Sequence, residues 1–217
     1  MFIESFLKII RYGVLKIMKK MWRSDDKRPI IATANHILEE MALPSGFRTF
    51  RDASFRDLAR FGKLPVSEHD RIFNELIVSA ICVPLFCIER MKEYKVEEYH
   101  FWQNVGKAIP QQFQYKLMSM GLDGGNAKLM RELITLRYEE YEKFLPKIAE
   151  VHVQESADFK NFSNFARYLG AAIHSTAIGT ADHIRRGDMK PGDPLVTYLI
   201  HWLMNLQHSS VDFVRKL

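Results

Sequence analysis

The chain has 217 residues, 47% of them apolar, and a formal net charge of +5 at pH 7. This length and composition suffice for one large globular domain and exclude an intrinsically disordered protein. Two cysteines are too few for a disulfide framework, which favours a reducing compartment such as the cytoplasm.

The positive charge is concentrated at the N-terminus. Residues 1–28 contain eight basic and three acidic side chains, whereas residues 29–217 contain 23 of each. On a helical wheel the apolar side chains of residues 1–28 cover roughly half of the circumference, and most of the charged ones cover the other half. We therefore predict two parts: a cationic amphipathic helix over residues 1–28, called the leader below, and a globular all-helical domain over residues 29–217.

A cationic amphipathic helix is typical of a segment that lies on an anionic membrane surface or docks on a protein partner. The leader residues predicted to make such contacts are Phe2, Phe6, Lys8, Ile10, Arg11, Val14, Lys16, Ile17, Lys19, Lys20, Met21 and Trp22. Two alternatives stay open: the apolar face packs on the domain, as surface helices ordinarily do, or the leader is a mitochondrial targeting sequence. No uninterrupted apolar stretch reaches the length of a bilayer span, so no transmembrane segment is predicted.

The remaining sequence reads as helix almost throughout. Proline and glycine predict breaks between helices, at Pro29, Pro44, Gly62–Pro65, Gly121–Gly125, Pro146 and Gly187–Pro194. These breaks predict an all-α, single-domain bundle of roughly seven to nine helices with partly orthogonal packing.

Residues 47–61 interleave phenylalanine with arginine. Arg48, Arg51, Arg56 and Arg60 are candidate nucleic-acid contacts, because guanidinium groups bind phosphates while bases stack on aromatic rings. The simpler interpretation is a helix that buries Phe55, Leu58 and Phe61 and exposes Arg56 and Arg60 as an i, i+4 pair. Since residues 29–217 are neutral, nucleic acid is not the expected partner. An acidic helix or a phosphorylated ligand would suit the arginines equally well.

Motifs for catalysis or for a cofactor are absent from the sequence. Glu97 and His100 have the Glu-x-x-His spacing of di-metal helical bundles, but the second copy that such bundles need is missing. There is no Gly-x-Ser-x-Gly nucleophile elbow and no glycine-rich phosphate loop. The sequence predicts no metal and no cofactor, and it leaves enzymatic activity undecided.

The last two predicted helices are the most informative part of the domain. Residues 170–181 are rich in glycine, alanine, serine and threonine, which predicts a central helix that a neighbour crosses closely. In the final helix the polar residues recur every three or four positions and share one stripe, made of Thr197, His201, Asn205, His208 and Asp212. The stripe either faces solvent or lines a polar cavity together with His174.

Two functions follow from these patterns. The first is a non-enzymatic helical binding or adaptor protein that associates through the leader with a membrane surface or a protein partner. The alternative is an all-helical enzyme or small-ligand-binding protein with a polar cavity lined by His174, His201 and His208. Whether the apolar face of the leader is covered by the domain, and whether the histidine stripe is buried, distinguishes the two.

Overall fold

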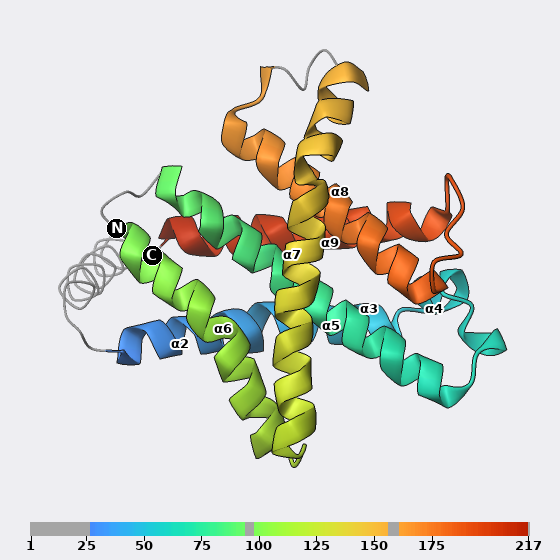
Figure 1. The fold of residues 1–217 in the computed structure, drawn as a ribbon, viewed down its shortest axis with the longest axis horizontal. Helices are drawn as coiled ribbons and strands as arrows, with labels where there is room; N and C mark the ends of the chain where they lie inside the picture. Colours follow the sequence, from blue (N-terminus) through green and yellow to red (C-terminus); the bar gives the residue numbers. More distant parts are fainter. Residues whose placement is uncertain (1–26, 94–97, 156–160, 217) are drawn as a thin grey trace, which may run out of the picture.

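A computed structural model describes residues 27–93, 98–155 and 161–216, and these form an all-α fold (Figure 1). The described residues contain no strand, and their helices fall within the predicted range of seven to nine. The predicted fold class is therefore confirmed. The leader residues up to 26, and Glu97 of the Glu-x-x-His motif, lie outside the described residues.

The domain begins with a nearly continuous helical rod. Helix α2 (Arg28–His36) runs through a π-helical stretch, Ile37–Ala42, into α3 (Leu43–Arg51). The break predicted at Pro44 is therefore wrong. In the wider turn just before the proline, the Leu43 N–H donates to the carbonyl of Leu38, five residues back. This re-routed hydrogen bonding accommodates a ring that would disrupt a regular α-helix at that point.

The segment after α3 turns twice before the central helix. The side chain of Asp52 accepts a hydrogen bond of 2.9 Å from the Phe55 N–H and so caps α4 (Ala53–Leu58). Arg60 then adopts the left-handed conformation, with φ 61°, ahead of a short 3-10 turn over Phe61–Lys63. The predicted exposed i, i+4 pair of Arg56 and Arg60 is therefore wrong, because the helix ends before Arg60.

Helix α5 (Val66–Glu89) is the centre of the fold. It packs against α3 and against all of the later helices: α6 (Tyr99–Ser119), α7 (Gly124–Glu155), α8 (Asn164–Arg185) and α9 (Pro194–Lys216). By length and composition α5 passes for a membrane span, but 78% of its most apolar window is buried inside the fold, as in a core helix. Cys82 and Cys87 lie on this helix as free, buried thiols.

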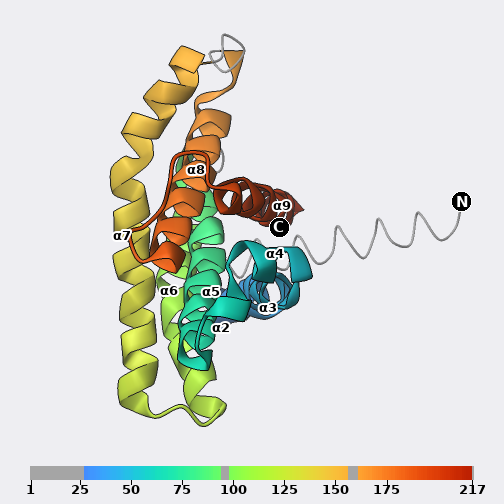
Figure 2. The same cartoon turned by 90° about the vertical axis from the view of Figure 1, so that its right-hand side faces the viewer.

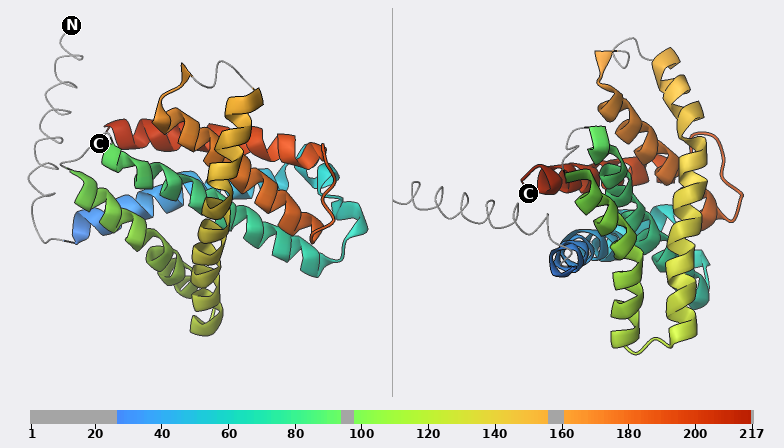
Figure 3. Two further views of the ribbon diagram at one scale, coloured as in Figure 1. Left: turned by 45° about the horizontal axis from the view of Figure 1, so that its top comes forward. Right: turned by 60° about the vertical axis from the view of Figure 1, so that its left-hand side comes forward.

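Helix α7 is the longest element and forms one edge of the molecule (Figure 2). It follows α6 through a tight turn and continues past Pro146, where a break was predicted. Pro146 is exposed, so the carbonyl that loses its hydrogen bond to the missing N–H can be satisfied by water. Helix α9 runs across α7 rather than along it, which is the orthogonal component of the packing (Figures 1 and 3).

Helix α8 crosses α7 at very short range, as its small residues predict. A Cβ added at Gly179 would lie 2.8 Å from Tyr141 Cδ1 and closer still to Cε1. Four residues earlier, Ser175 Oγ donates a 2.6 Å hydrogen bond to the carbonyl of Tyr141. Glycine at this point lets the buried tyrosine ring approach the α8 backbone closely.

Gly179→Ala tests this crossing. The added methyl group meets an immobile buried ring, so we expect the free energy of unfolding to fall by about 1–3 kcal/mol in urea titrations. Gly106→Ala is the matched control, since a Cβ there makes an ordinary 3.4 Å contact with Ile88. The control should be neutral or gain up to about 1 kcal/mol from helix propensity. A similar gain for Gly179→Ala would contradict the close crossing.

Candidate functional site: a groove between α8 and α9

An open groove of about 850 Å³ lies between α8 and α9, with α7 at one end. Its exposed surface is mainly apolar, although polar side chains make up about half of its lining residues. The lining includes Phe162, Phe165, Leu169, Ile173, Met204 and Val211, together with His152, His174, Gln207, His208, Asp212 and Arg215. Apolar walls with a few convergent polar groups are the usual composition of a small-molecule site.

Two histidines from different helices meet in this groove. His152 Nε2 on α7 and His174 Nδ1 on α8 are 2.6 Å apart, and the two rings stand edge to face. One ring donates its N–H and the other accepts, so the hydrogen bond requires at least one neutral imidazole. The pair joins α7 to α8 where His174, which is half-buried, lines the groove.

The surroundings of His174 disfavour its charged form. Burial in the groove and, second, the neighbouring His152 lower the pKa of His174 from 6.5 to about 4. The other titratable groups that line the groove, His208, Asp212 and Arg215, belong to α9 and are exposed to solvent. At neutral pH the groove therefore presents a neutral His174 beside an apolar wall.

The predicted polar stripe of α9 is divided by the structure. All five of its side chains, Thr197, His201, Asn205, His208 and Asp212, are exposed. His208 and Asp212 line the groove with His174, whereas Thr197, His201 and Asn205 do not line it. The stripe is thus the solvent side of an amphipathic helix, and the groove uses the end of it. The predicted grouping of His174 with His201 and His208 is wrong for His201.

The four candidate nucleic-acid arginines lie at the other end of the domain. Arg48, Arg51 and Arg60 are exposed, and the guanidinium of Arg56 stacks over Phe61 at 4.4 Å from the ring centroid. Phe55 and Phe61 are buried in the core, so their faces are not available for stacking bases. The buried phenylalanines agree with the simpler interpretation, whereas its i, i+4 pair of Arg56 and Arg60 does not form.

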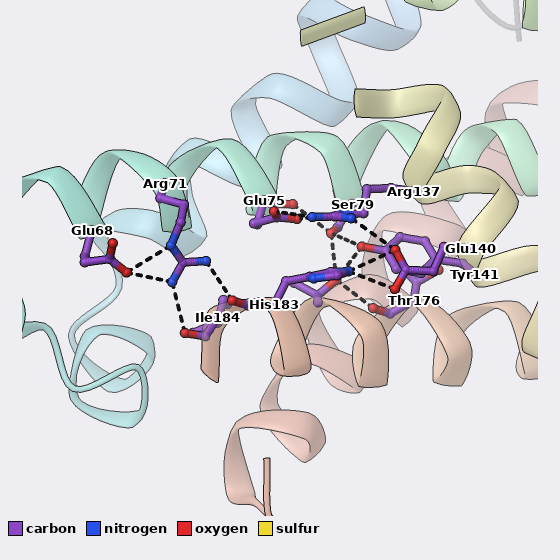
Figure 4. A network of polar contacts seen from close by, with 11 residues as sticks. Glu68, Arg71, Glu75, Ser79, Arg137, Glu140, Tyr141, Thr176, His183 and Ile184 are labelled. Atoms are coloured by element: carbon purple, nitrogen blue, oxygen red, sulfur yellow. Dashed lines mark hydrogen bonds and ion pairs between the residues drawn. The ribbon is translucent and has the colours of Figure 1, made fainter. Parts of the chain in front are cut away.

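Sequence reasoning missed a buried polar network that joins α5, α7 and α8 (Figure 4). Arg137 donates two hydrogen bonds, of 3.0 and 2.8 Å, to the buried carboxylate of Glu75 and a third, of 3.1 Å, to Glu140. Glu140 in turn bonds the ring of His183 at 2.9 Å. No periodicity signals this network, because each of these side chains reads as an ordinary charged position of an amphipathic helix.

A hydroxyl cluster extends the network into the core. Ser79 Oγ donates to the Glu75 carbonyl at 2.7 Å and bonds Thr180 Oγ1 at 2.6 Å, and the Tyr141 hydroxyl lies 3.3 Å from Ser79 Oγ. Neither Ser79, Tyr141 nor Thr180 lines any of the three described cavities. These groups bond one another and hold three helices together, so we assign them a structural role.

Comparisons with known proteins assign no relative. No family model matches the chain. Neither a curated protein nor a solved structure matches it either. Function must therefore be argued from the site itself.

The described residues do not bring together the parts of a familiar catalytic centre. Among them, no group of three or more histidine, cysteine, aspartate or glutamate side chains is placed to hold a metal ion. Burial raises the pKa of both thiols, Cys82 and Cys87, so neither has the thiolate character of a nucleophile. The groove is a candidate binding surface, and the histidine pair His152 and His174 belongs to its lining.

The lowered pKa of His174 predicts a pH-dependent stability. Between pH 6.5 and about 4 the unfolded chain binds a proton at His174 that the folded chain excludes, so acidification through this window lowers stability. Melting temperatures of the wild type should fall more steeply across this window than those of His174→Gln. His201→Gln, on the exposed stripe outside the groove, should follow the wild type. Parallel profiles for all three proteins would contradict the assignment.

Proposed function

We propose that the protein is a non-enzymatic helical binding protein that attaches to an anionic membrane surface through its leader. One observation carries the proposal: the whole excess of positive charge lies in residues 1–28, beside apolar residues at helical spacing. Lys27 and Arg28, the last basic residues of the run, are exposed at the start of α2. A neutral domain with a cationic amphipathic leader is the composition of a peripherally attached protein.

The core of the domain supports separate roles for the domain and the leader. Most buried side chains from α2 through α9 form one cluster built around α5, and Cys87, Phe165 and Leu169 form a smaller one among the described residues. A single basic residue near an anionic leaflet contributes about 1 kcal/mol, so several of them together with apolar insertion suffice for reversible attachment.

Charge reversal in the full-length chain tests the attachment. The triple variant Lys16→Glu, Lys19→Glu, Lys20→Glu removes three attractive charges and introduces three repulsive ones. We expect it to lose more than about 100-fold in partitioning to phosphatidylserine-containing vesicles in flotation assays, because each lost charge is worth about 1 kcal/mol. Wild-type binding should weaken with salt and be absent on neutral phosphatidylcholine vesicles.

The matched control places the same change of net charge on the domain. Lys63→Glu, Lys107→Glu, Lys190→Glu alters three exposed lysines of the domain and should retain wild-type flotation. Equal loss of flotation in both triple variants would show that the effect depends on net charge alone and not on the leader. Absence of wild-type flotation on anionic vesicles would remove the membrane from the proposal.

The groove between α8 and α9 favours a second candidate function, the binding of an elongated and mainly apolar ligand that carries a polar group. Its volume of about 850 Å³ is within the range of ligand pockets, and Phe165, Leu169 and Ile173 supply an apolar floor. His174, His208 and Arg215 would meet the polar end. This candidate replaces the polar cavity expected from the sequence with a mainly apolar one.

A dansyl-labelled fatty acid is a suitable probe of the groove. Ala166→Trp fills the groove from its α8 wall, where Ala166 is exposed, so we expect the Kd of the probe to rise at least about tenfold, which corresponds to about 1.4 kcal/mol. Ala32→Trp, at an exposed position of α2, controls for an added aromatic ring. Equal affinity of the two variants in a fluorescence titration would exclude the groove as the binding site.

A further inference from the structure

His174 has one ring nitrogen that is open to a ligand in the groove between α8 and α9. Its Nδ1 is engaged with His152 Nε2 at 2.6 Å. The other nitrogen, Nε2, is not fully buried and forms no hydrogen bond with any residue that the structure describes. Because His174 is half-buried and lines the groove, Nε2 is the hydrogen-bonding group of this ring that a bound molecule would meet.

The titratable groups around His174 can carry more positive than negative charge. Helix α7 contributes His152 to the lining, and α9 contributes His208, Asp212 and Arg215. Among the described residues, α8 adds no other titratable side chain to the lining, and α5, which packs against both α8 and α9, adds no residue to it. Three imidazoles and one guanidinium therefore share the groove with a single carboxylate. This balance favours a ligand with an anionic head group over one with a cationic head group.

The apolar part of the groove extends from His174 along α8. Phe165, Leu169 and Ile173 line it at intervals of four residues, and the eight residues from the first to the last span about 12 Å of helix. Val211 lines it from α9. This length suits an extended hydrocarbon chain of about ten carbons, with its head group at the histidine end.

We propose that the groove binds a straight-chain carboxylic acid as its anion, and that His174 takes up one proton from solvent when the carboxylate binds. Nε2–H of the resulting imidazolium donates to the carboxylate, and Nδ1–H donates to Nε2 of His152. The N–H bond made by the incoming proton is the only covalent bond that forms, and none breaks within the protein or the ligand. This inference rests on the second candidate function, because it names the ligand class and the pH dependence of the same groove.

The proton is taken up because the ligand brings a negative charge to a ring that is otherwise neutral. Burial and, second, His152 hold the pKa of His174 at about 4 in the unliganded groove. A carboxylate within hydrogen-bonding distance favours the imidazolium and raises this pKa. The same contact satisfies the carboxylate, which loses water when it enters the groove. His152 is a positioning residue, because its Nε2 accepts the second N–H and so orients the ring of His174.

Titration calorimetry of the full-length chain with decanoate tests the uptake. At about pH 6 the binding heats in MES and in Bis-Tris buffer should differ by the amount that one proton per ligand requires, because the buffer supplies the proton. The Kd should fall as the pH is lowered from about 7 to about 5.5, by up to about tenfold per pH unit where uptake is complete. Decanoate stays ionised in this range, since carboxyl groups have pKa values near 4. Decan-1-ol, which has the same chain and no carboxylate, should bind without proton uptake.

Two variants assign the proton to His174. His174→Gln keeps a hydrogen-bonding side chain that cannot be protonated, so the proton uptake and the pH dependence of the decanoate Kd should both be lost. His201→Gln, on the exposed stripe outside the groove, is the matched control and should behave as the wild type. The comparison of buffers with the wild-type chain needs no variant, so it decides the proposal even if His174→Gln fails to fold.

The possible failures point to different causes. Binding of both decanoate and decan-1-ol without proton uptake would overturn this inference and leave the groove as a binding site. Failure of both compounds to bind would overturn the second candidate function and this inference with it. Loss of the uptake in His208→Gln, together with its retention in His174→Gln, would place the proton on α9 and overturn the assignment to His174.

Discussion

The close contact between the ring of Tyr141 and Gly179 sets the distance between α7 and α8, and much of the domain follows from that distance. It brings Ser175 within hydrogen-bonding reach of the Tyr141 carbonyl and carries the Tyr141 hydroxyl to Ser79 and Thr180. With a larger residue at position 179 the helices would separate and these buried hydroxyls would lose their partners, at a cost that exceeds the lost contact itself.

The charged side chains around this contact determine how the helices are placed more than they increase the stability of the fold. An apolar replacement of the Glu75–Arg137 pair could stabilise the fold equally well, but removing one partner would leave an uncompensated charge in the core. Arg137 satisfies Glu75 and Glu140 together, and Arg71 donates to the last carbonyls of α8 at His183 and Ile184. Sliding α8 along α7 would break the bonds of Arg71 to the end of α8 and the bond between Glu140 and His183, so these contacts fix one register (Figure 4).

The features that depend on the local pattern of residue types could be predicted from the sequence. Small residues at positions 170–181 indicated the close crossing, and the spacing of the polar residues placed them on one stripe of α9 but left open whether that stripe faces solvent or a cavity. The predictions from sequence were wrong or incomplete where the structure depends on the surroundings of a residue or on contacts between distant residues. Pro44 and Pro146 do not end their helices, because a π-helical turn and exposure to water satisfy the backbone. The contacts of His152 with His174 and of Glu75 with Arg137 depend on helix register, which no local spacing reveals.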